Sequence, residues 1–130
     1  MNAKTEVRVA DLTGKALDWA VAIASGAEEV KTTEHGISCI YQLPEGGCWT
    51  NLYTPSTDWS QGGLLIDMHR ISFVTAGTGP EDQYGNEPIV ALSSSLHYKA
   101  CEGSTHLIAA CRAIVATKLG ETISVPAELA

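Results

Sequence analysis

Residues 105–120, THLIAACRAIVATKLG, carry the strongest structural signal in the chain. Ser104 or Thr105 can cap the start of a helix here, and Gly120 can follow its last turn. Lys118 would then complement the helix dipole. Apolar side chains recur every three or four positions, which predicts a helix with one buried stripe: Leu107, Ala110, Cys111, Ile114 and Val115.

A second helix is predicted near the start of the chain, with Thr13 as its N-cap and Gly26 just after its last turn. A helix that is apolar over much of its surface is buried on two sides. We therefore expect this helix to lie under a sheet and a loop, or against another subunit. Its two apolar rows are Leu17, Ala20, Val21 and Ala24, and Leu12, Ala16, Trp19 and Ile23.

Most of the remaining chain has strand character. Strands are predicted at 6–9, 37–43, 48–54, 71–75, 89–98 and 123–125. Residues 44–47 form a turn between two of them, while 55–63 and 76–88 are predicted to be irregular. Trp19 and Trp49 are expected in the core. This order predicts an α+β fold, a single domain with a mixed or antiparallel sheet of about five strands packed against two main helices.

The composition narrows the classes of function. The chain has 130 residues, with 8 Lys and Arg against 15 Asp and Glu, a net charge of −7. The basic residues are scattered, so we expect no non-specific binding of nucleic acid, although a basic partner would suit this charge. The chain has no apolar run of membrane-spanning length and its start lacks the apolar region of a signal peptide, so we expect neither membrane insertion nor secretion.

The cysteine and histidine spacings match no metal motif. The four cysteines form no C-x-x-C pair, and we expect them to be free thiols. Cys111 is expected to be buried and to pack as a small apolar side chain. No known metal-ligand motif has the sequence spacing of His97, Cys101 and His106, a group that His69 could join. We therefore predict no metal site, and no cofactor motif is present.

Three segments resemble the NinX-like family of small bacteriophage proteins. Together they cover about a quarter of the chain in the family's order. They are LTGKALDWAVA at 12–22, STDW at 56–59 followed by Gly62 and Gly63, and THLIAACR at 105–112 continuing as VATKLG at 115–120.

The resemblance implies a phage or prophage accessory protein that acts in the cytoplasm of an infected bacterium. It implies no particular activity. The family usually has a proline where His106 stands, and an arginine one place before a cysteine in the last helix. Here Cys111 precedes Arg112, which agrees with a packing role for this cysteine.

Residues 56–63 form the best candidate for a binding site. Ser56 and Thr57 offer hydroxyl groups, Asp58 can accept hydrogen bonds, and Trp59 offers a flat apolar face for stacking. Two glycines, Gly62 and Gly63, would let a ligand approach the backbone. The alternative is structural: Asp58 pins a loop, Trp59 fills the core and the glycines permit a turn.

The start of the last helix is the second candidate. The free N–H groups near Ser104 and Thr105 could bind an anion. If the fold brings this helix start beside residues 56–63, the two form one pocket, to which Arg70, Lys99 and His106 could supply positive charge.

Three functions remain open at this point. The first is a non-enzymatic binding protein for a host protein or a small ligand, which could itself form a homodimer through the apolar first helix. The second is binding or sequestration of a nucleotide-like ligand, with Trp59 stacked on its base. The third is a small hydrolase that uses Asp58 and His69, although no catalytic motif supports an enzyme.

Overall fold

The computed structural model describes residues 3–75, 89–92 and 100–130. Within these residues the chain forms eight strands and three α-helices, so the predicted α+β class is confirmed. The helices are α1 (Gly14–Ala24), α2 (Trp59–Met68) and α3 (His106–Leu119). The strands are β1 (Lys4–Arg8), β2 (Glu28–Thr33), β3 (Gly36–Leu43), β4 (Gly46–Thr50), β5 (Ser72–Thr75), β6 (Ile89–Leu92), β7 (Ala100–Gly103) and β8 (Thr122–Pro126).

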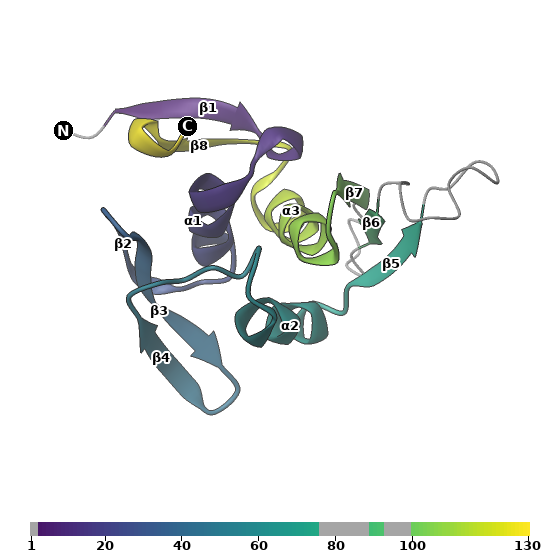
Figure 1. Ribbon diagram of the computed structural model, residues 1–130, viewed down its shortest axis with the longest axis horizontal. Coiled ribbons are helices and arrows are strands. Elements are labelled where there is room, and N and C mark those ends of the chain that lie inside the picture. Colours follow the sequence, from purple (N-terminus) through teal and green to yellow (C-terminus); the bar gives the residue numbers. More distant parts are fainter. Residues whose placement is uncertain (1–2, 76–88, 93–99) are drawn as a thin grey trace.

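The described strands form three small antiparallel sheets, where the sequence had suggested one sheet of about five strands. Their orders are β1-β8, β2-β3-β4 and β5-β6-β7. Figure 1 shows α1 and α3 at the centre, with the sheets arranged around them. The expectation of one sheet is wrong for the described strands, because α1 and α3 lie between the three small sheets (Figure 1).

The core lies mainly between α1 and α3. Small side chains of both helices are fully buried, among them Ala20, Ala109 and Ala113. Larger apolar groups fill the space around them, including Leu17 and Ile114. Small residues let the two helices approach closely, and the apolar faces of the sheets then cover the pair. The buried stripe predicted for the last helix is thereby confirmed.

Both predicted helices begin and end where their caps indicate. Thr13 is the N-cap of α1, and Gly26 follows that helix with a φ of 81°. Thr105, rather than Ser104, caps α3, since its side-chain oxygen accepts from the N–H of Ile108 at 3.1 Å. Gly120 is the C-cap of α3 with a φ of 101°. The positive φ values explain why glycine stands at both ends.

The two apolar rows of α1 are covered mostly by the chain itself. Leu12 and Ala16 are buried, Trp19 is half-buried with the Lys4 ammonium 5.7 Å from its ring, and Ile23 is exposed. The helix therefore needs no second subunit to bury most of its apolar surface, and self-association stays a prediction.

Two expectations about the hairpin and its surroundings need correction. Trp49 is 65% exposed, not in the core, because it lies opposite Ile40 on the face of β3 and β4 that points away from α1. Strand β2 was not predicted, because its sequence EEVKTT has almost no apolar side chains. It forms by pairing with β3. Among the described residues, no helix has the length and apolar character needed to cross a membrane.

Helix α2 is the largest departure from the sequence-based expectation. It begins inside the stretch predicted to be irregular, directly after Pro55–Asp58, and it includes both glycines. Each glycine in a helix costs about 1 kcal/mol relative to alanine, so propensity alone argues against this helix. Tertiary packing overrides that cost.

Gly62 explains the packing. Its Cα faces the carbonyl oxygen of Pro55 and the side chain of Leu107 on α3, and a Cβ placed there would lie only 2.6 Å from the Leu107 Cδ2 atom. Gly63 has no such neighbour, since its Cβ would lie 3.8 Å from the Trp59 ring. Gly62 therefore permits the close approach of α2 to α3, and Gly63 does not contribute to it.

We expect Gly62→Ala to lower the free energy of unfolding by about 1–3 kcal/mol, because the new methyl group overlaps backbone atoms that cannot move freely. Gly63→Ala is the matched control and should raise that free energy by up to about 1 kcal/mol through helix propensity. Urea denaturation of both variants measures the difference. Equal effects of the two substitutions would contradict this account of the packing.

Candidate functional site

The segment that precedes α2 is a tight turn and not an open loop. The N–H groups of Thr57 and Asp58 both donate to the carbonyl oxygen of Thr54, at 3.1 and 2.8 Å. The Asp58 carboxylate accepts from the N–H of Ser60 at 2.9 Å and from its hydroxyl group at 2.7 Å. Asp58 is thus the N-cap of α2. It has the structural role that the sequence analysis gave as the alternative to ligand binding.

A buried carboxylate anchors this turn to the core. Asp18 of α1 is only 4% exposed, and its Oδ1 atom accepts from the N–H of buried Ser56 at 2.9 Å. A buried polar group without a partner is costly, so each of these residues satisfies the other. Ser56 therefore positions the start of α2, and its backbone is not available to a ligand.

Sequence reasoning missed Asp18. The available signal was its position within a helix predicted to be buried on two sides, where a carboxylate has no route to solvent. Burial raises the pKa of Asp18 above its ordinary value, and the hydrogen bonds from Ser56 oppose this effect. The pKa of the nearby Cys111 thiol is also raised, first by burial and then by Asp18.

The raised pKa gives a prediction for the pH dependence of stability. A carboxyl group whose pKa is higher in the folded state contributes its full stability at acid pH and loses it as the pH rises through the folded-state pKa. Asp18→Asn keeps the shape and the hydrogen-bond acceptor of the protonated acid but does not titrate. The stability of this variant relative to the wild type should therefore increase as the pH rises through the folded-state pKa of Asp18. Thermal unfolding between about pH 3 and pH 8 checks the trend, because this range begins just below the usual carboxyl pKa of about 4 and extends well above it.

Asp18→Ala is the companion variant. It leaves the Ser56 N–H buried without an acceptor and should cost about 1–3 kcal/mol at every pH. If the wild type instead gained stability over Asp18→Asn as the pH rose, the ionised carboxylate would be favoured in the fold and the assigned direction would be wrong.

The two candidate segments meet at an aromatic cluster. The rings of Trp59 on α2 and His106 on α3 have centroids 6.4 Å apart. His106 also makes an edge-to-face contact with Phe73 of β5, at 4.9 Å. Trp59 is 59% exposed, so it does not fill the core. We call Trp59, His106 and Phe73 the Trp59 surface. Ser104 and Thr105 are exposed beside it at the start of α3.

Other candidate residues lie elsewhere. His69 is the C-cap of α2, at the opposite end from Asp58, and Arg70 follows it. A ten-residue helix is about 15 Å long, so Asp58 and His69 do not form a catalytic pair. Burial and the charge of Lys118 lower the pKa of His69. Lys99 and His97 are outside the described residues.

Arg70 has a structural role at the end of α2. Its φ is 53°, and its N–H donates to the Asp67 carbonyl while that of Ile71 donates to Ile66. This is the motif that usually places glycine after a helix. The guanidinium group lies 3.8 Å from the Asp67 carboxylate, at the exposed surface. Arg70 and Gly63 line a shallow hollow of about 380 Å³ that does not include Trp59.

Metal-ligand groups do not converge in the part of the chain that the structure describes. No three His, Cys, Asp or Glu side chains there could bind one metal ion. None of the four cysteines, all of which the structure describes, is in a disulfide bond, and Cys39 and Cys111 are buried. Burial raises the pKa of Cys39 to about 11, so its thiol is protonated and unreactive at neutral pH.

Comparison with known proteins identifies the family. The model of one protein family, described as bacteriophage P22 NinX, matches residues 8–118. A search of curated proteins gives no match. The matched range includes all three helices except the last residue of α3, together with the Asp18–Ser56 contact and the Trp59 surface. The chain belongs to the bacteriophage P22 NinX family.

Proposed function

We propose that this phage accessory protein acts without catalysis, by binding a partner protein of the host cell through the Trp59 surface. The observation that carries the proposal is the exposure of a large aromatic side chain that lies at the junction of two helices and a strand. Exposed tryptophan is uncommon on soluble proteins and is enriched among the residues that dominate protein interfaces.

The surroundings of Trp59 restrict its movement in the absence of a partner. His106 lies against the indole, Phe73 lies against His106, and the Asp58 cap fixes the first turn of α2. An anchor that is already ordered loses little conformational entropy on binding. This arrangement therefore suits a recognition surface better than a tryptophan on an unsupported loop would.

Helix α2 has two further exposed apolar side chains, which lie on a different face of the helix from Trp59. Leu64 and Met68 are four residues apart on its outer face, and both are exposed. The carboxylate of Asp67 lies on the same exposed side of the helix. The exposed indole of Trp59 and the net charge of −7 together favour a partner segment that offers an apolar side chain with basic residues beside it.

A nucleotide-like ligand is less well supported. Small-molecule sites are concave, whereas Trp59 is largely exposed and does not line the hollow beside Arg70. The anion-binding end of α2 is already occupied by the carboxylate of Asp58, which would repel phosphate. The start of α3 could still accept an anion, so the nucleotide alternative rests on that helix end alone.

Replacement of Trp59 tests the proposal. We expect Trp59→Ala to abolish capture of the partner from lysates of the bacterial host, because removing a central aromatic anchor typically costs 2 kcal/mol or more, about thirtyfold in affinity. Quantitative mass spectrometry of proteins retained by the immobilised chain provides the measurement, and titration with the purified partner confirms it.

The chain supplies a matched control. Trp49→Ala removes an equally exposed tryptophan from a different face and should leave capture unchanged. Equal capture by wild type and Trp59→Ala would contradict the proposal. A thermal shift with nucleotides that Trp59→Ala removes, without any captured protein, would favour the nucleotide alternative instead.

A further inference from the structure

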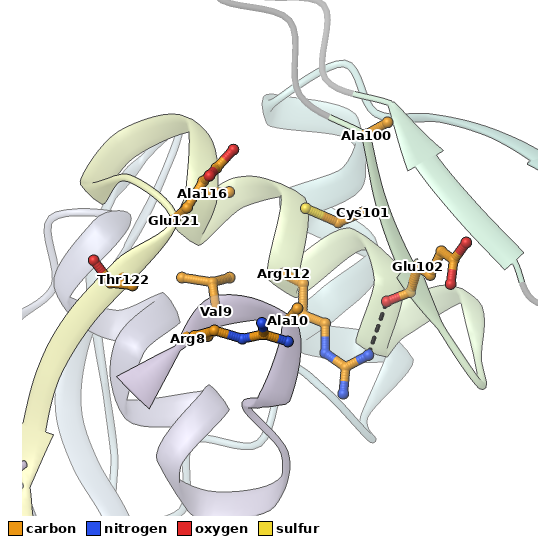
Figure 2. A pocket seen from close by; sticks show the side chains of 10 residues that line it. All are labelled: Arg8, Val9, Ala10, Ala100, Cys101, Glu102, Arg112, Ala116, Glu121 and Thr122. Carbon is orange, nitrogen blue, oxygen red and sulfur yellow. Dashed lines mark hydrogen bonds between the residues drawn. The ribbon is translucent and has the colours of Figure 1, made fainter. Parts of the chain in front are cut away.

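A second candidate site lies on another part of the molecule. A cavity of about 560 Å³ opens between the end of β1, strand β7 and the last turns of α3. This volume is in the range of sites that bind small molecules, about 300–1,000 Å³. Its lining shares no residue with the Trp59 surface, and Figure 2 shows the side chains that surround it.

Two of the three arginines of the chain line this cavity. Arg112 projects from α3, and its Nε and Nη1 atoms donate to the backbone carbonyls of Leu12 and Glu102, at 3.0 and 2.8 Å. These bonds fix the guanidinium group without cancelling its charge. Because a guanidinium has five N–H donors, these two bonds leave others for a ligand.

Arg8 provides the second positive charge. Its side chain extends beneath Val9 toward Arg112 (Figure 2). Arg8 pairs with Asp11 at 3.2 Å, but both side chains are largely exposed. Such exposed pairs contribute little and exchange readily. Two guanidinium groups that border one cavity favour a bound anion, although the net charge of the chain is −7.

The rest of the lining restricts the kind of anion. Val9, Ala10 and Ala116 supply apolar wall, which suits a ligand with a hydrocarbon body. Glu102 and Glu121 also line the cavity, and Figure 2 shows their carboxylates directed away from the Arg8 guanidinium. These carboxylates would disfavour ligands with several negative charges, such as nucleoside triphosphates.

From this lining we infer a binding site for a small organic anion that has a single negative charge and an apolar body. The acid group contacts Arg8 and Arg112, and the apolar body lies along Val9 and Ala116. This inference does not depend on the function proposed for the Trp59 surface, because the two sites have no residue in common.

Fluorescent probes of this chemistry test the site directly. The anion 8-anilinonaphthalene-1-sulfonate should bind the folded protein saturably, and the neutral N-phenyl-1-naphthylamine, which has the same rings without the sulfonate, should bind at least fivefold more weakly. Arg8→Gln should weaken binding of the anion about fivefold, the effect expected of one partly screened charge. Ala10→Leu should also weaken it by filling part of the cavity.

Arg70→Gln is the matched control, because Arg70 forms the same exposed i,i+3 pair with an aspartate outside the cavity. It should leave the affinity unchanged. Absence of saturable binding at millimolar probe, equal affinity of the wild type and Arg8→Gln, or equal affinity for the two probes would each overturn the inference. Loss of the signal in Trp59→Ala, with no loss in Arg8→Gln, would also overturn it by moving the probe to the other surface.

Discussion

The close packing of α1 against α3 is the constraint on which the rest of the structure depends. None of the three sheets has more than three strands in the described residues, and such small sheets cannot bury their apolar faces alone. Each contributes to a shell around the helix pair instead. Buried alanines such as Ala20, Ala109 and Ala113 make that central contact close, and larger side chains there would move the shell apart.

Two contacts connect this centre to the Trp59 surface. The Asp18 carboxylate anchors Ser56 from α1, and Leu107 of α3 lies where a side chain at position 62 would be. The turn before α2 is therefore fixed from one central helix, and the body of α2 from the other. Residues that seemed available to a ligand, Ser56 and Gly62, instead determine where Trp59 lies. Within residues 56–63, the Trp59 side chain remains exposed, and Ser56 and Gly62 fix its position.

Local signals determined how much could be predicted from the sequence. Helices α1 and α3 were predicted with their caps because Thr13, Gly26, Thr105 and Gly120 act within a few residues along the chain. Helix α2 was missed because its stability comes from a contact with Leu107, which is distant in sequence. Strand β2 was missed for the same reason, since pairing with β3 outweighs its polar composition.

The candidate site shows the same division between local and distant causes. The sequence indicated that residues 56–63 and the start of the last helix mattered, but not that they touch. The sequence analysis also placed Trp49 in the core, whereas its side chain is exposed. Alternating residues in a hairpin separate its two faces, but the pattern does not show which face packs on the rest of the chain. Arg8 and Arg112 gave no signal, since two single arginines far apart in the chain become neighbours of one cavity only after β1 and α3 pack together.

The two candidate sites occupy different structural settings, which argues for different kinds of ligand. The Trp59 surface is an exposed, ordered projection supported by α2, α3 and β5, and a second macromolecule can cover it. The cavity that Arg8 and Arg112 line is recessed between β1, β7 and α3, and its volume suits a small molecule. Helix α3 contributes His106 to the first site and Arg112 to the second, less than two turns apart along the same rigid element.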